Sequence, residues 1–277
     1  MIFLLAALLV APTPADIVAA AQSAAWRTIA PENLIVMETG AGTMTIELAP
    51  DFAPAHVEAI RNLVSSGRFD SGAIVRVQDN YVVQWAARPG AAKPGPRAKP
   101  LPAEYERAAK GLAITPLGAP DAYAEAGFAD GWPVAQDRTT GTAWLAHCYG
   151  MVGVGRDDPP DTGDGSELYA VIGHGPRHLD RNIALVGRVI AGIELHAALP
   201  RGSETMGFYK GPAEQTGIRR ARMASTIPDA PRFEVMKTGS ASFADYKTAR
   251  ANRSGFFVRP AGASDLCNVT VPVREVK

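Results

Sequence analysis

The chain has 277 residues, and its 28 Lys and Arg balance 28 Asp and Glu, so its formal net charge is zero. A neutral chain lacks the charge that draws a protein to nucleic acid or to an anionic membrane surface, which argues against both partners. The 27 Gly and 22 Pro exceed the usual share of these residues and argue against a long helical bundle. Hydrophobic residues make up 47%, enough for a sizeable core in a fold rich in strands and loops.

The chain begins with an apolar run from Ile2 to Val10. This run is shorter than the roughly 20 residues that span a bilayer, and it is typical of the hydrophobic region of a secretory signal. Small-residue cleavage sites follow at 13–15 and 19–21, although no Lys or Arg precedes the run, so a plain N-terminal helix is the alternative. We expect residues 1–21 to be a signal peptide and linker, and the mature protein to be periplasmic or secreted with no membrane span.

The next segments predict a hairpin, a helix and a series of short strands. The β-rich runs 34–37 and 44–48 flank a Gly-containing turn, which favours a hairpin. A helix follows, since Pro54 suits a first turn, apolar residues recur at helical spacing from Val57 to Val64, and Gly67 is placed to end it. Further strands are expected at 73–77, 81–85, 150–154, 168–172, 183–189 and 218–223, with a short helix at 192–199.

Two regions lie outside this pattern. Residues 87–147 are rich in Gly and Pro, and because a structureless loop of this length is uncommon, we expect short elements or a cover over a functional rim. After Pro228 we expect a helix over 242–253 capped by Ser242, and strands at 256–258 and 269–273. The domain prediction is a β-dominated unit from 31 to 227, with 87–147 inserted, and a small C-terminal extension at 228–277.

The two cysteines, Cys148 and Cys267, lack the spacing of a metal site. In an exported chain they predict one disulfide, and two buried thiols are the alternative.

Five blocks of sequence then resemble a known family, in that family's order. They are Gly42–Leu48 with Phe52-Ala53-Pro54, Arg76–Gln84, Gly153–Arg156, Gly165–Tyr169, and His178-Leu179-Asp180 followed by Val186–Val189. Together they resemble the cyclophilin-type peptidyl-prolyl cis/trans isomerases, and specifically a divergent, exported bacterial member. The resemblance implies a mainly β fold, an eight-stranded antiparallel barrel capped by two helices, with 87–147 as a long inserted loop region.

The resemblance also implies an activity that needs no nucleophile, cofactor or metal. Rotation about an X–Pro bond is slow because amide resonance makes the C–N bond partly double. An arginine that donates to the proline nitrogen binds the twisted amide better than the planar one, which lowers the barrier. Arg76 takes this role and Gln84 orients it, as the matching residues do in the family.

The other positions that the resemblance assigns are substrate contacts. Tyr81, Val82, Tyr169, Leu179 and Ile183 would line the proline pocket, and Val154, Gly155 and Arg156 would lie along the substrate backbone. Glu167 stands where the family has Gln and would reach Arg76 as an ion pair. His178 takes the position of a usual Trp. Tyr169 replaces a Phe and brings a hydroxyl that needs a partner.

The sequence therefore predicts a monomeric isomerase acting on proline-containing, unfolded or extended polypeptide segments. The first alternative is a cyclophilin-like binding module or chaperone with little catalysis. A further one is a barrel whose insertion and extension dock a fixed partner.

Overall fold

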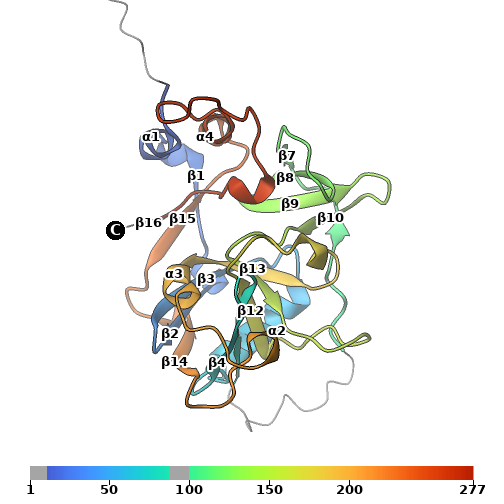
Figure 1. Cartoon of the computed structure of the whole chain (residues 1–277), viewed down its shortest axis with the longest axis vertical. Coiled ribbons are helices and arrows are strands. Elements are labelled where there is room, and N and C mark those ends of the chain that lie inside the picture. The colour runs from blue at the N-terminus through green and yellow to red at the C-terminus, as the bar shows by residue number, and fades with distance from the viewer. Residues whose placement is uncertain (1–10, 88–99, 277) are drawn as a thin grey trace, which may run out of the picture.

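The structure is a computed structural model that describes residues 11–87 and 100–276 (Figure 1). The apolar run at 2–10 and the first part of the Gly- and Pro-rich stretch, 88–99, lie outside the described residues.

Eight strands close into an antiparallel barrel in the order β11-β12-β5-β4-β14-β2-β3-β13, which confirms the expected fold class. They are β2 (Leu34–Thr39), β3 (Gly42–Leu48), β4 (Ala73–Val77), β5 (Val82–Ala86), β11 (Met151–Val154), β12 (Glu167–Val171), β13 (Leu185–Ala191) and β14 (Thr216–Met223). The helices α2 (Pro54–Ser65) and α3 (Ile193–Ala197) both pack on the barrel core. The chain leaves α2 through Gly67, whose φ of 70° is in the left-handed region that glycine adopts readily.

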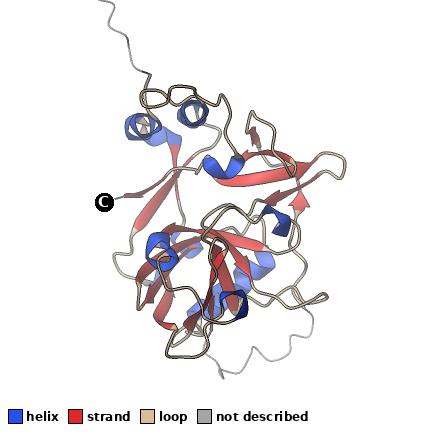
Figure 2. Ribbon diagram, in the orientation of Figure 1, coloured by secondary structure: helices blue, strands red, loops and turns tan. Residues whose placement is uncertain are grey.

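Residues 107–145 form a second sheet, which confirms the short elements expected within 87–147 and corrects the long inserted loop that the resemblance implied for this described part. Its order is β6-β10-β9-β8-β7, formed by β6 (Arg107–Ala108), β7 (Thr115–Pro116), β8 (Glu125–Ala129), β9 (Trp132–Asp137) and β10 (Thr142–Leu145). A third sheet joins the two ends of the chain: β1 (Trp26–Thr28), β15 (Arg232–Met236) and β16 (Val273–Val276). Figures 1 and 2 show these two sheets and the helices α1 (Pro14–Ala20) and α4 (Ala241–Ala251) stacked on the barrel.

The stacked segments share one hydrophobic core. The ring of Phe243 on α4 meets that of Phe128 on β8 edge-on, with centroids 5.0 Å apart. Leu34, Met151 and Leu185 from the barrel strands join the same cluster, so the second layer packs directly on the barrel wall. The segment after residue 227 is therefore an integral part of this layer.

Three details of the C-terminal segment differ from expectation. Helix α4 begins at Ala241, one residue before the predicted start, and its N-cap is not Ser242 but Ser240, which accepts from the backbone N–H of Phe243. Residues 256–258 form an exposed loop rather than a strand, and the last strand starts at Val273. Single-turn 3-10 helices complete the elements: η1 (Ser23–Ala25), η2 (Pro31–Asn33), η3 (Arg177–Leu179), η4 (Thr205–Gly207), η5 (Ala224–Thr226) and η6 (Leu266–Asn268).

Cys148 and Cys267 are joined in a disulfide, as the exported-chain interpretation predicted. The bond ties the end of the inserted sheet to η6, across 119 residues of sequence.

Candidate active site

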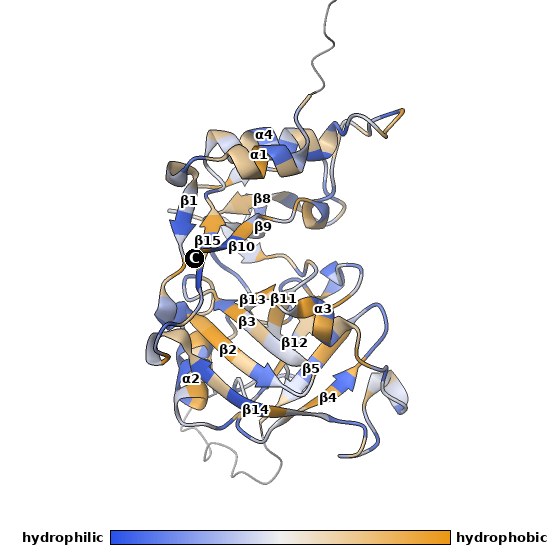
Figure 3. Ribbon diagram, turned by 90° about the vertical axis from the view of Figure 1, so that its left-hand side faces the viewer, coloured by the Kyte–Doolittle hydropathy of each residue, from blue (hydrophilic) through white to orange (hydrophobic). Residues whose placement is uncertain are grey.

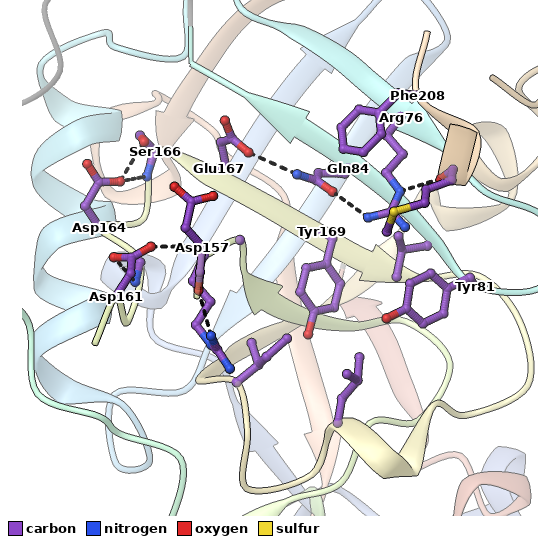
Figure 4. A pocket seen from close by; sticks show the side chains of 17 residues that line it. Arg76, Tyr81, Gln84, Asp157, Asp161, Asp164, Ser166, Glu167, Tyr169 and Phe208 are labelled. Carbon is purple, nitrogen blue, oxygen red and sulfur yellow. Dashed lines mark hydrogen bonds between the residues drawn. The ribbon is translucent and has the colours of Figure 1, made fainter. Parts of the chain in front are cut away.

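A pocket of about 480 Å³ opens on the barrel where β4, β5 and β12 lie side by side (Figure 4). Ten of the twelve predicted site residues line it: Arg76, Tyr81, Val82, Gln84, Gly155, Arg156, Glu167, Tyr169, Leu179 and Ile183. The predicted positions thus converge on one cavity from five separate stretches of the chain.

Arg76 is the most constrained cation of this pocket. Its residue is only 8% exposed, and its Nε donates to the carbonyl oxygen of Met206 at 2.7 Å. Nη1 donates to Gln84 Oε1 at 3.3 Å and Nη2 donates to Gln78. A guanidinium has five N–H groups, so these bonds leave one on each terminal nitrogen for a ligand.

Two aromatic rings hold the plane of the guanidinium. The carbon Cζ of Arg76 lies 5.4 Å from the ring centroid of Tyr81 and 5.0 Å from that of Phe208, within the range of a cation–π contact. Burial lowers the pKa of Arg76, but an arginine starts so high that the group stays charged at neutral pH. The site therefore presents a fixed, charged hydrogen-bond donor.

Gln84 links Arg76 to a carboxylate. It lies directly opposite Arg76 in the β4–β5 register, and its Nε2 donates to Glu167 Oε2 at 3.0 Å. Because the carboxylate accepts, the amide must turn its oxygen toward Arg76. The expected ion pair between Glu167 and Arg76 is wrong: Gln84 stands between them, and Glu167 orients the amide instead.

The wall beside Arg76 is apolar. Val82 and Tyr169 are buried in a small cluster with Val171, and Tyr81 and Ile183 pack against it. Such a surface suits a proline ring.

The Tyr169 hydroxyl has the partner that it needs. It lies 2.9 Å from His147 Nε2, and the other ring nitrogen of His147 lies 2.9 Å from Asp180 Oδ1. Asp180 and Asp121 both accept hydrogen bonds from Arg177. Each polar side chain from Tyr169 to Asp121 therefore has a hydrogen-bond partner. The carboxylate requires the His147 proton on Nδ1, which leaves Nε2 to accept from Tyr169.

Two predicted residues lie elsewhere. Val154 is fully buried in the barrel core beneath the pocket. His178 is exposed and lines a separate hollow beside Trp144 and Arg181, because the turn of η3 directs Leu179 to the pocket and His178 away from it. Both placements are corrections to the expected substrate contacts.

Seven lining residues were missed. Asp157, Asp161, Gly163, Asp164 and Ser166 come from the loop between β11 and β12, and Met206 and Phe208 come from the loop around η4. Figure 4 shows the acidic loop on one side of the pocket and Arg76 with Phe208 on the other. The first loop runs from the matched block at 153–156 into the one at 165–169, which contains Ser166, whereas the η4 loop carries no pattern.

Known proteins share this architecture. A family model described as cyclophilin type peptidyl-prolyl cis-trans isomerase/CLD matches residues 34–223. Probable peptidyl-prolyl cis-trans isomerases of Brucella suis and Brucella melitensis are each 27% identical over 196 residues, covering 66% of this chain and 79% of theirs. The crystal structure of cyclophilin AquaCyp293 from Hirschia baltica is 24% identical, with a TM-score of 0.72 over 90% of this chain and 93% of that one.

Since the family model covers well over half of the sequence, the chain belongs to the cyclophilin-type peptidyl-prolyl cis-trans isomerase family. It is accordingly an isomerase of X–Pro peptide bonds. The likeness to AquaCyp293 extends beyond the matched barrel and shows a common fold for the second layer as well.

Proposed function

We propose that Arg76 is the catalytic residue of this isomerase and acts by stabilising the twisted X–Pro amide. The observation that carries the proposal is a buried guanidinium held in place beside an apolar wall. With the proline ring on Val82 and Tyr169, the remaining N–H groups of Arg76 are available to the prolyl nitrogen. The nitrogen lone pair accepts a hydrogen bond only when resonance is broken, so this bond forms in the transition state rather than in either planar ground state.

Gln84, Glu167 and Met206 are positioning residues in this account. Glu167 fixes the amide of Gln84, and Gln84 then fixes Nη1 of Arg76. Met206 has a φ of 61°, an unfavourable conformation for a residue with a side chain, and its carbonyl accepts from Arg76. The strain is consistent with a backbone shaped to hold the arginine.

The substrate is a proline-containing segment of an unfolded or extended polypeptide. Gly155 and Arg156 border the pocket and lie where such a backbone would pass. The chain works as a monomer. It is exported to the periplasm or the medium, a proposal supported by the apolar run at 2–10 and by a disulfide, which oxidising compartments permit.

The test is an isomerisation assay on a short X–Pro peptide, with binding of the same peptide measured in parallel. Arg76→Ala should lower kcat/KM at least tenfold, about 1.4 kcal/mol of transition-state stabilisation, while peptide affinity changes less. Gln84→Ala should give a smaller loss. An Arg76→Ala enzyme with the wild-type kcat/KM would contradict the assignment, and a wild type that binds without accelerating exchange would favour a binding module.

A further inference from the structure

The loop that leaves α4 exposes three consecutive apolar residues. Phe256 and Val258 are 92% and 93% exposed, and Phe257 is partly exposed with its ring edge-on to Phe256. Large side chains this open to water usually mark a contact surface when they occur together. Figure 3 shows that the end of the molecule carrying α1 and α4 is the end opposite to α2 and β4.

This loop is also locally basic. From Tyr246 to Ser264 the sequence contains Lys247, Arg250, Arg253 and Arg259 and no Asp or Glu. Asp245 and Asp265 bound the segment, and Asp16 on the neighbouring α1 is engaged with Thr13. The net charge of zero, which argued against an anionic membrane partner, therefore averages over an uneven distribution.

Two of the four cations are available to a partner outside the chain. Lys247 and Arg250 already donate to the carbonyl oxygens of Pro116 and Asn268. Arg259 is exposed, and Arg253 lies over the ring of Phe257 with Cζ 5.3 Å from its centroid. Arginines beside exposed aromatic rings are typical of proteins that bind the surface of a bilayer. The aromatic rings lie at the depth of the lipid headgroups, and the guanidinium groups bind the lipid phosphates.

The described part of the chain begins at residue 11, at the same end of the molecule. Helix α1 packs against α4, and its first residue, Pro14, follows an apolar stretch that holds no charged side chain from Ile2 to Thr13. The substrate pocket lies on the barrel, in the other layer of the molecule. A partner bound at the loop would therefore leave the pocket open to polypeptides.

We propose that the loop Ser254–Pro260 docks on the surface of an anionic lipid bilayer. Phe256, Phe257 and Val258 enter the headgroup region, and Arg253 and Arg259 bind the phosphates. Among residues 11–87 and 100–276 no helix is long and apolar enough to cross a membrane.

The test is co-sedimentation of the full chain with vesicles of one part phosphatidylglycerol to three parts phosphatidylcholine. Binding should fall at high salt and with pure phosphatidylcholine. Phe256→Ser with Val258→Ser should lower the partition coefficient at least tenfold, and Arg259→Glu should lower it roughly fivefold. Matched controls are Leu195→Ser, an exposed apolar residue on α3, and Arg219→Glu, an exposed cation on β14.

Both loop variants should keep the wild-type kcat/KM on a free peptide, which shows that they fold. Absence of vesicle binding by the wild type would overturn the proposal and leave a protein as the partner of the loop. Equal binding of wild type and loop variants would also overturn it, since the apolar N-terminal run common to all of them would then account for the attachment.

Discussion

At the scale of single residues, the polar side chains of the site are held in few conformations. Arg76 has three hydrogen-bond acceptors and two ring faces around it, so most of its rotamer freedom is lost before substrate arrives. Because the guanidinium is already held in place, the reaction does not incur the entropy cost of ordering it. Arg76, the proposed catalytic residue, lies on strand β4 rather than on a loop.

Tyr169 provides a test of the polar chain behind the pocket. Tyr169→Phe keeps the ring that faces the proline but leaves His147 Nε2 buried without a partner, which should cost about 1–3 kcal/mol of unfolding free energy. The kcat/KM should stay within a few-fold of wild type, because the apolar wall is intact. Urea unfolding and the isomerisation assay check the two expectations.

The control is Tyr81→Phe on the same wall, since the Tyr81 hydroxyl makes no hydrogen bond to another described residue. It should leave the stability unchanged. If the two substitutions cost the same stability, the His147 contact contributes nothing measurable.

The sequence predicted the centre of this site and missed its periphery. Arg76 and Gln84 could be paired because strand residues of equal parity share a face and the family's spacing was present. Met206 and Phe208 could not be foreseen, since a loop without periodicity gives no signal of where it folds back. His178 was placed wrongly because successive side chains of a 3-10 turn point about a third of a turn apart, so Leu179 faces the pocket and His178 does not.

At the scale of elements, a buried ion pair within the barrel connects through its arginine to the inserted sheet. Glu47 on β3 accepts two hydrogen bonds from Arg188 on β13, at 2.9 and 2.7 Å. Arg188 Nη1 donates onward to the carbonyl of Gly131, in the turn between β8 and β9, and its guanidinium lies over the ring of Trp132. Arg188 therefore links the barrel to the inserted sheet.

Glu47→Gln tests this junction. The variant retains the shape of the side chain but leaves Arg188 buried without a counter-charge, which should cost about 3–5 kcal/mol of unfolding free energy. Glu38→Gln, which breaks the more exposed pair with Arg220, is the matched control and should cost at most about 1 kcal/mol. Similar losses in the two variants, measured by urea unfolding, would contradict a structural role for the junction.

Some helices and strands could be predicted from local sequence patterns, and others could not. The hairpin of β2 and β3 and the helix α2 were predicted well, because each contains its own turn, cap and periodicity. Strands β6 and β7 have only two residues each and contain no periodicity to detect. Strand β15 pairs with β1 and β16, partners from opposite ends of the chain, so its existence depends on tertiary contacts.

At the scale of the whole molecule, three buried titratable groups make stability depend on pH. Burial lowers the pKa of His147 and of His196. Burial acts to raise the pKa of Asp180, but its hydrogen bond with His147 and the charge of Arg177 bring the net pKa below its ordinary value. In all three cases the unfolded chain takes up protons at a higher pH than the folded one, so acid favours unfolding.

The free energy of unfolding should therefore change little between about pH 7 and about pH 9 and fall as the pH drops through about 6.5, where the unfolded histidines titrate. The contribution of Asp180 should be lost below about pH 4. Urea midpoints across this range test the expectation. His147→Asn should reduce the first fall and leave the part due to His196, and a midpoint independent of pH from 7 to about 5 would contradict it.

In the proposed mechanism the shape and hydrogen bonds of Arg76, and not simply its positive charge, lower the barrier to X–Pro rotation. The most direct measurement is the cis–trans exchange rate of a bound X–Pro peptide, followed by NMR at saturating enzyme, where binding no longer contributes. Arg76→Lys keeps the charge but loses the planar fork that Met206 and Gln84 hold. We predict that it slows exchange on the enzyme at least tenfold, about 1.4 kcal/mol, with little change in peptide affinity. Exchange at the wild-type rate in Arg76→Lys would contradict the account.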